Sequence, residues 1–425
     1  MASLLPEDRV RQLARSTGLV KREREIDPVA MMWVLVLGFG VRLQRTLAGL
    51  KREYEFETLT NLSDGSWYER FTPELVGFLR GCVGLGIEQL AAEASGKLGE
   101  RLKGFKDLMV QDSTVIRLHA KLAKTFPATR ARKVAAGVKV SLLISAVANG
   151  PKKVAIFGER TPEAHMLRVG PWVKDRILLV DLGFYKFQLF ARIAENGGYF
   201  ITRLKDNANP LLVASHTVHR GRAIELAGKH WQDVLPRLAR EVLDAEVEVA
   251  FSRRKYRGKK SGDALRVRLV AVWNEEARDY HVYLTNLPAE VLDAKEIADL
   301  YAVRWEIELV FKELKSRYAL DEIPSANKQV VEALVWTAIL TLLVSRRLYN
   351  YMRSRARASE QPRYTRLRWA TVFVQWAPRV MRWMAKHYGF AASWEELEAL
   401  EGRVLHSHAL DPHVERERLM QGWVA

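Results

Sequence analysis

The segment 301–315, YAVRWEIELVFKELK, places acidic, basic and aromatic side chains at helical spacing. At 3.6 residues per turn, one side of such a helix holds four polar positions within an arc of roughly 60°, and the opposite side is apolar. In isolation, this pattern is most often an ordinary surface helix with spaced charge pairs. In a reactive site, the same face offers one carboxylate among cationic and aromatic groups, at Tyr301, Arg304, Glu308 and Lys315.

Two aspartates elsewhere in the chain stand at strand positions. Asp112 interrupts the apolar pattern of LMVQDSTVIRL, and Asp181 follows the apolar run RILLV and precedes Leu182 and Gly183. Each has a simple alternative, because a strand-end carboxylate is often satisfied by backbone donors and an Asp in a Gly-containing turn is common. Either aspartate alone therefore indicates nothing specific about function.

Asp112, Asp181 and Glu308 together form a set with a defined chemistry. Two strand-borne carboxylates and one helix-borne carboxylate suit a two-metal phosphoryl-transfer site, and hard oxygen ligands favour Mg²⁺ or Mn²⁺. Two such ions roughly 3.5 to 4 Å apart activate the attacking oxygen and stabilise the leaving oxygen. We expect Asp112 to bridge two ions, with Asp181 and Glu308 each completing one side. The sequence offers no GxSxG or P-loop pattern that competes with this interpretation.

The elements that must position these residues differ in character along the chain. Three consecutive strands rich in β-branched residues begin with the one that holds Asp112, a strand–helix–strand order follows around Asp181, and a second β-rich stretch precedes the Glu308 helix. The turn residues Asn149-Gly150-Pro151 predict a hairpin within the first group of strands. We expect an α/β protein in five parts: a helical N-terminal region (1–104), the first part of a mixed core (105–206), a β-rich insertion (207–299), the Glu308 helix with core completion (300–345) and a basic helical C-terminal region (346–425).

Composition limits the kind of partner and the compartment. The chain of 425 residues carries a formal net charge of +17, which favours a polyanion such as nucleic acid or an anionic membrane surface. Its single cysteine, Cys82, excludes an internal disulfide and a cysteine-cluster zinc site, and this fits a reducing compartment such as the cytoplasm. The apolar runs at 29–41 and 330–344 are too short for membrane spans and predict core helices. The start of the chain shows no pattern of an export signal.

A basic segment follows the Glu308 helix. Residues 346–386 hold ten Arg and one Lys against the single acid Glu360, interleaved with Tyr and Trp. Because this segment carries more than half of the net charge, we interpret it as a contact surface for backbone phosphates. The alternatives are a basic amphipathic helical pair with aromatic core residues, or a helix on a membrane surface.

The spacing of Tyr301, Arg304, Glu308 and Lys315 resembles the Tyr-Arg-Glu-Lys signature of bacterial insertion-sequence transposases of family four, which belong to the Asp-Asp-Glu (DDE) class. The runs VQDSTVIRL and LLVDLGFYKFQLFARIAENGGYFITRLK are similar to the two Asp blocks of the same family. The resemblance covers about residues 108–347 and is weaker outside them. It implies a ribonuclease H-like mixed sheet flanked by helices and interrupted by the β-rich insertion.

The resemblance also implies roles for residues around the carboxylates. Tyr301, Arg304 and Lys315 contact phosphates beside the scissile bond, and Trp305 follows Arg304 as it often does in the family. Family members that form a DNA hairpin stack a flipped base on an aromatic residue late in the insertion, where this chain has His281. Two further basic residues, on the strand after Asp181, are candidates for holding the DNA backbone, although such residues are as often simply solvated: Arg203 and Lys205.

The function that these features predict is metal-dependent, cut-and-paste DNA transposition. Water attacks a phosphodiester at the end of an insertion sequence, and the freed 3′ hydroxyl then attacks target DNA. We expect a homodimer on paired double-stranded DNA ends, with residues 1–104 contributing to end binding, in the prokaryotic cytoplasm at the nucleoid and without a membrane partner. Two alternatives stay open: a ribonuclease H-like nuclease without strand transfer, and a catalytically silent DNA-binding regulator derived from a transposase.

Overall fold

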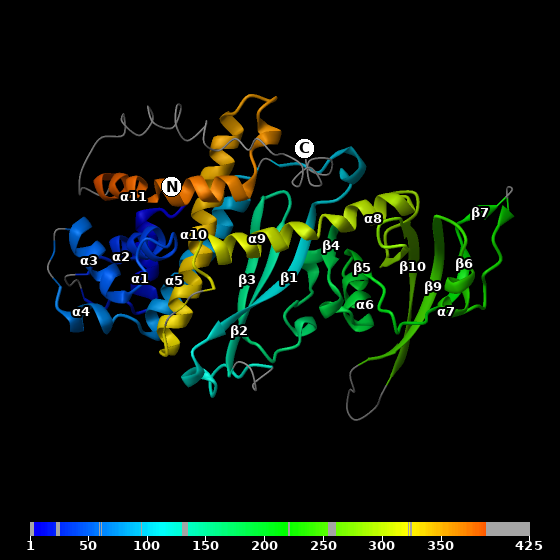
Figure 1. Cartoon of the computed structure of the whole chain (residues 1–425), viewed down its shortest axis with the longest axis horizontal. Coiled ribbons are helices and arrows are strands. Elements are labelled where there is room, and N and C mark those ends of the chain that lie inside the picture. The colour runs from blue at the N-terminus through cyan, green and yellow to red at the C-terminus, as the bar shows by residue number, and fades with distance from the viewer. Residues whose placement is uncertain are drawn as a thin grey trace.

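A mixed sheet of nine strands extends from the middle of the molecule toward one end (Figure 1). The structure is a computed structural model that describes residues 4–387, with gaps at residues 23–25, 59, 61, 95, 130–134, 220–221, 254–260, 322 and 324. Residues 388–425 of the predicted C-terminal region lie outside the described residues. In spatial order the strands are β3 (Gly150–Gly158), β2 (Ala136–Ser145), β1 (Asp107–Leu118), β4 (Arg176–Val180), β5 (Tyr199–Arg203), β11 (Asp279–Thr285), β10 (Gly262–Asn274), β9 (Val242–Ser252) and β6 (Leu211–Ser215).

The first five strands form the half of the sheet that carries both aspartates. β1, β2 and β3 are antiparallel neighbours, and Asn149 adopts a left-handed φ of 51° at the turn between β2 and β3, which confirms the predicted hairpin. β4 and β5 are parallel to β1 and are connected by helix α6 (Phe187–Glu195). Helix α6 ends at Glu195 and is followed by Gly197, whose φ of 69° suits a residue without a side chain. The sequence therefore predicted this βαβ order correctly.

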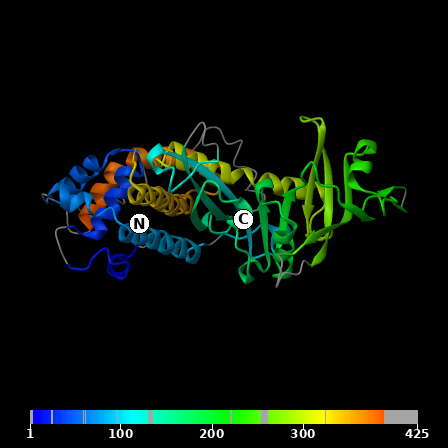
Figure 2. The same ribbon diagram turned by 90° about the horizontal axis from the view of Figure 1, so that it is seen from below.

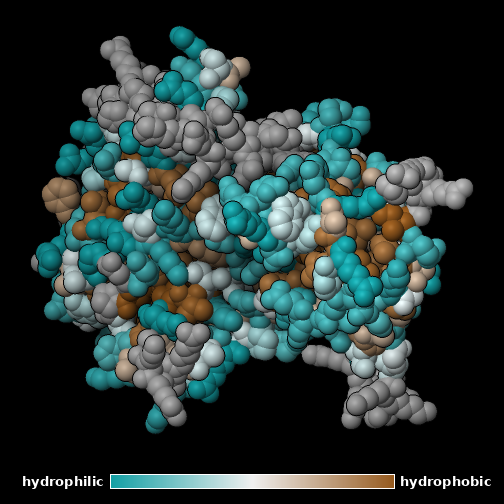
Figure 3. Space-filling model, turned by 45° about the vertical axis from the view of Figure 1, so that its right-hand side comes forward, coloured by the Kyte–Doolittle hydropathy of each residue, from teal (hydrophilic) through white to brown (hydrophobic). Residues whose placement is uncertain are grey.

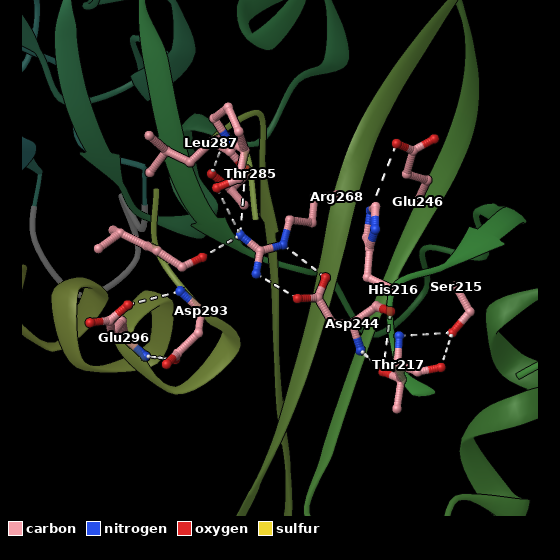
Figure 4. Close-up of polar contacts among 12 residues, drawn as sticks. Ser215, His216, Thr217, Asp244, Glu246, Arg268, Thr285, Leu287, Asp293 and Glu296 are labelled. Atoms are coloured by element: carbon pink, nitrogen blue, oxygen red, sulfur yellow. Dashed lines mark hydrogen bonds and ion pairs between the residues drawn. The ribbon is translucent and has the colours of Figure 1, made fainter. Parts of the chain in front are cut away.

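Four strands between 207 and 299, β6, β9, β10 and β11, continue the same sheet, whereas β7 and β8 form a separate two-stranded sheet. β11 pairs with β5 in antiparallel register, and β10, β9 and β6 follow outward from it. Figure 4 shows how Arg268 on β10 fixes this part to the next segment of chain. Its guanidinium donates to both carboxylate oxygens of Asp244, at 2.8 and 2.5 Å, and to the Leu292 carbonyl at 2.7 Å. A small hairpin and a short helix lie beyond β6: β7 (Val218–His219), β8 (Arg222–Ala223) and α7 (Trp231–Val234).

Helices from both ends of the described chain pack together at one end of the molecule (Figure 2). The long helix α10 (Lys328–Arg355) lies beside α5 (Pro73–Ala92) and the π-helix η1 (Leu35–Phe39). The Thr341 hydroxyl on α10 donates to the Val36 carbonyl of η1 at 3.1 Å. The remaining helices of this group are α1 (Glu7–Ser16), α2 (Pro28–Val34), α3 (Leu47–Thr58), α4 (Asp64–Tyr68) and α11 (Arg366–His387).

Two helices of the described chain, α5 and α10, are long and apolar enough to cross a membrane by length and composition. Within α10, 83% of the most apolar stretch is buried inside the structure, and in α5 the share is 39%. Burial against neighbouring helices accounts for the apolar composition of α10, as the run at 330–344 predicted.

The face shown in Figure 3 is largely hydrophilic, with separate hydrophobic patches between the polar side chains.

The segment predicted as one helix from Tyr301 to Lys315 is broken near its start, so this prediction was wrong. Helix α8 (Ala294–Ala302) begins at a capping box of Asp293 and Glu296, and helix α9 (Trp305–Ser316) follows after two residues. Between them the backbone bonds are the shorter i to i−3 type, from Val303 to Leu300 and from Arg304 to Tyr301. This tighter winding turns Tyr301 relative to Glu308, and the regular 3.6-residue period does not hold across the junction.

Candidate active site

The sheet places the two predicted aspartates beside each other. Gln111 on β1 pairs with Val180 on β4 in parallel register, and Asp112 and Asp181 each follow by one residue. Asp112 lies within β1, whereas Asp181 directly follows the last residue of β4 and caps the 3-10 helix η6 (Leu182–Phe184). Two carboxylates one residue beyond a parallel pair reach the same part of the sheet.

Arg304 lies among all three predicted carboxylates. Its Nη1 is 3.5 Å from Oδ2 of Asp112, and its Nη2 donates to Oε1 of Glu308 at 2.7 Å. The negative charge of Asp181 also acts on this guanidinium. Helix α9, which begins directly after Arg304, packs against β1 and so brings Glu308 over the aspartates. The structure therefore gathers Asp112, Asp181 and Glu308 around one cationic side chain.

Burial makes the Asp112 carboxyl a weaker acid than usual. It raises the pKa of the Asp112 carboxyl to about 6, against the opposing effects of the Ser113 amide, which donates to Oδ1 at 2.7 Å, and of Arg304. The charges of Asp181 and Glu163 raise this pKa further. Binding of a cation requires the ionised form of Asp112, and in this structure that form destabilises the fold.

We expect Asp112→Asn to stabilise the protein against unfolding in the presence of a metal chelator. The folded state binds the Asp112 proton more tightly than the unfolded chain, whose pKa is about 3.9. The penalty for the ionised group is therefore absent below about pH 4 and complete above about pH 6. We predict a gain of about 1–3 kcal/mol at pH 8 and a smaller gain at pH 5, measured by urea unfolding. Equal gains at the two pH values contradict the prediction.

The donor chemistry of the three carboxylates fits a divalent cation. All three offer hard oxygen ligands of the kind that Mg²⁺ and Mn²⁺ prefer. In the part of the chain that the structure describes, no group of three or more Asp, Glu, His and Cys side chains is already gathered as ligands. The Arg304 guanidinium, which engages two of the three carboxylates, stands among them. For the three carboxylates to converge on a cation, Arg304 would have to release these ion pairs.

The predicted phosphate contacts differ in their access to solvent. Tyr301 is buried, its hydroxyl donates to the Val180 carbonyl at 3.4 Å, and its ring lies 5.2 Å from that of Tyr283. Trp305 is 49% exposed, so its indole is open to a partner. Lys315 is in the last turn of α9, and burial lowers its pKa. The structure thus offers Trp305 directly and holds Tyr301 inside the protein.

The two basic residues after Asp181 have different aromatic neighbours. Arg203 ends β5, pairs in register with Tyr283, and its charge acts on Tyr301. The Lys205 ammonium lies 5.3 Å from the centre of the Tyr185 ring. His281, two residues before Tyr283, has a pKa that burial and then Arg203 lower. The structure therefore groups Arg203, His281 and Tyr301 at one edge of the carboxylate cluster.

Part of the basic segment 346–386 has a role that the sequence did not reveal. Arg346 is 1% exposed and pairs with Glu313 of α9, and Arg366 donates to Glu306 of the same helix at 2.5 Å. Arg347 pairs with Glu93 at the end of α5. These internal ion pairs remove charges from the proposed phosphate surface, so the interpretation of this segment was wrong for Arg346 and Arg366. Arg346 and Arg366 instead hold α9 against α10 and α11.

A fourth acidic residue near the cluster was missed in the sequence. Glu163 lies on the 3-10 helix η4 (Glu163–His165), and Ser113 donates its hydroxyl hydrogen to Oε1 of Glu163 at 2.6 Å. Neither helical nor strand periodicity marks this short turn, and Glu163 is 50 residues from Ser113. Only the tertiary structure brings the two together.

Comparisons with known proteins identify the family of the chain. The family profile described as the transposase DDE domain matches residues 103–344. The transposase of insertion sequence IS231F from Bacillus thuringiensis subsp. israelensis is 23% identical over 367 residues, which cover 78% of this chain and 75% of the relative. The transposase of IS1151 from Clostridium perfringens is 21% identical over 271 residues, covering 57% and 56%. Because the family match spans more than half of the chain and includes all three carboxylates, this protein belongs to the DDE transposases of bacterial insertion sequences.

Proposed function

We propose that this transposase moves its insertion sequence by a cut-and-paste reaction on double-stranded DNA, with Asp112, Asp181 and Glu308 as its catalytic residues. The observation that carries the proposal is the grouping of these three carboxylates around Arg304. Water attacks a phosphodiester at the transposon end and frees a 3′ hydroxyl, and that hydroxyl then attacks a phosphodiester of the target. Each step exchanges one P–O bond for another, so no covalent protein intermediate is required.

We infer that the core is ribonuclease H-like. Supporting this are the order β3-β2-β1-β4-β5, the antiparallel start and the parallel β1, β4 and β5, with α9 against β1. The Tyr301, Arg304, Glu308 and Lys315 spacing favours family four among the insertion-sequence transposases. The strands at 207–299 are an insertion into this core, placed between β5 and the helix that carries Glu308.

The side chains around the three carboxylates have separate tasks in the proposed mechanism. Asp112, Asp181 and Glu308 would hold two Mg²⁺ or Mn²⁺ ions, which when bound activate the attacking oxygen and stabilise the leaving oxygen. The Ser113 amide orients the Asp112 carboxylate. Arg304 transfers its donors from Asp112 and Glu308 to a DNA phosphate, since a guanidinium suits carboxylate and phosphate alike. Lys315, Trp305, Arg203 and Lys205 contribute further DNA contacts.

We infer that end binding and end pairing involve the helical parts of the chain, in a homodimer that works on paired ends at the nucleoid in the cytoplasm. The N-terminal helices and the helices after residue 345 pack on one another through α10, so they form one helical body beside the core. The helical body also contacts α9, so a DNA end held by this body lies next to α9. We also propose that the chain divides into the five parts predicted from its sequence.

Strand transfer with pre-cut ends tests the reaction. The DNA flanking the coding region is first searched for inverted terminal repeats, and a duplex with this end and a free 3′ hydroxyl is incubated with the protein, Mg²⁺ and a plasmid. We expect joined products with the 3′ hydroxyl end and none with a 3′ dideoxy end. Cleavage of uncut ends without joining favours the nuclease alternative. DNA binding with neither cleavage nor joining favours the silent regulator.

A further inference from the structure

We propose that Glu163 is a positioning residue that fixes the Asp112 segment against the Asp181 segment. The proposal deepens the proposed function and rests on it for the roles of the two aspartates. It concerns a residue outside the Tyr-Arg-Glu-Lys signature and outside both Asp blocks, on the short 3-10 helix η4.

On the Asp112 side, Glu163 acts through Ser113. The Ser113 amide donates to Oδ1 of Asp112 at 2.7 Å, and the Ser113 hydroxyl donates to Oε1 of Glu163 at 2.6 Å. A single residue therefore contacts both carboxylates, one with its backbone and one with its side chain. The bond to Glu163 fixes the rotamer of Ser113 and the local path of β1 next to Asp112.

On the Asp181 side, Glu163 lies against the backbone of Gly183. A Cβ atom built on Gly183 would lie only 1.5 Å from Oε2 of Glu163, so the carboxylate occupies the space that any other side chain would need. Gly183 lies in η6, which begins directly after Asp181, and η4 packs against η6. The two oxygens of one carboxylate therefore touch the segments that carry the two aspartates.

The charge of Glu163 has its own partner. The Lys139 ammonium on β2 lies 3.8 Å from Oε1 and also donates to the Thr161 carbonyl at 3.2 Å. The Glu163 and Lys139 side chains are 24% and 16% exposed. With Ser113, Lys139 and the Gly183 backbone around it, Glu163 is fixed in place, as a residue that supports ligands from behind needs to be.

Four variants test the proposal: Ser113→Ala, Glu163→Ala, their combination, and Glu163→Gln, which keeps an oxygen acceptor for Ser113. Mn²⁺ binding is measured by electron paramagnetic resonance in the presence of end DNA, and single-turnover end cleavage is measured in parallel. We expect each alanine variant to weaken Mn²⁺ binding and to slow cleavage by about 10-fold or more, with DNA affinity unchanged. The double variant should be no worse than either single variant. Glu163→Gln should stay within about 3-fold of the wild type in both measurements.

Matched controls separate positioning from loss of fold. Glu248→Ala removes a carboxylate on β9 that is 35% exposed and pairs with Arg266 at 2.9 Å, and it should change neither measurement. The melting temperatures of all variants are recorded. Glu163→Ala and Ser113→Ala should remain folded at the assay temperature and still bind end DNA.

Several outcomes overturn the proposal. If Glu163→Gln loses as much as Glu163→Ala, the charge of Glu163 matters directly and positioning through Ser113 is wrong. Losses that multiply in the double variant show that the two side chains act separately. Wild-type-like Mn²⁺ binding in the alanine variants also contradicts it. If the wild type binds Mn²⁺ but never cleaves, the proposed function fails while the positioning of the ligands is still decided by the Mn²⁺ data.

Discussion

Asp112→Ala should reduce cleavage of transposon-end DNA by about 10³-fold or more, a loss comparable to removal of a principal electrostatic group from other active sites. The physical reason is the position of Asp112 at the centre of the cluster, beside Asp181 and in contact with Arg304. No neighbouring carboxylate reaches the same point from β1. Binding of end DNA should change by less than about 3-fold, because loss of one acidic group slightly favours a polyanion.

The measurement is a single-turnover cleavage assay beside a gel-shift titration, with Mg²⁺ and again with Mn²⁺. Asp263→Ala is a suitable control, because Asp263 lies on β10 and its Oδ1 accepts from the next residue's amide at 2.8 Å, as that of Asp112 does at 2.7 Å. This control should cleave like the wild type. If Asp112→Ala retains wild-type cleavage, or if it loses DNA binding in parallel with cleavage, Asp112 does not have the role proposed for it.

Arg346→Met should lower the free energy of unfolding by about 3–5 kcal/mol, the largest effect on stability that we expect from a single substitution. Arg346 on α10 and Glu313 on α9 form an ion pair in which both side chains are 1% exposed. Burial raises the pKa of Glu313, and Arg346 is the main group that opposes this. Without Arg346 the protein must bury an unpaired carboxylate or protonate it, and either change costs stability.

Urea unfolding at pH 7 measures this loss, with Arg347→Met as the matched control. Arg347 is the next residue of α10, and its pair with Glu93 is partly exposed at 22% and 28%, so its loss should cost less than about 1 kcal/mol. The double variant Arg346→Met with Glu313→Gln should recover part of the loss, because no charge is then left buried. Similar losses for Arg346→Met and Arg347→Met would show that burial of the pair has no special weight.

The positions of the three carboxylates proposed as catalytic were largely predictable from local pattern. Asp112 and Asp181 fall within or at the end of apolar strands, and parallel strands of one sheet bring such positions together. Glu308 lies on a helix with a clear apolar side. The hairpin at Asn149 and the crossover helix α6 also followed from turn residues and periodicity. These features depend on neighbours in sequence, which a single sequence displays.

Features that depend on distant partners could not be predicted. The count of basic residues in 346–386 did not show that Arg346 and Arg366 are neutralised by Glu313 and Glu306, because both acids lie on an earlier helix. The residues between α8 and α9 suit a continuous helix as well as the tight turns that they form. The sequence therefore gives no indication of the break before α9. Tyr301 was expected on a polar face, yet the sheet covers it.

The hydrogen bonding from β3 to β6 is unbroken through the described strands, and it has a mechanical consequence. The strands β11, β10, β9 and β6 are not a movable lid, because β11 is hydrogen-bonded to β5 and Arg268 ties β10 to the chain that leads into α8. If a duplex contacts both β9 and the carboxylates, the protein holds the two contacts at a fixed distance. The span between these contacts is set when the protein folds, so lengthening or shortening the DNA between them by a few base pairs should be met by bending of the DNA rather than of the protein.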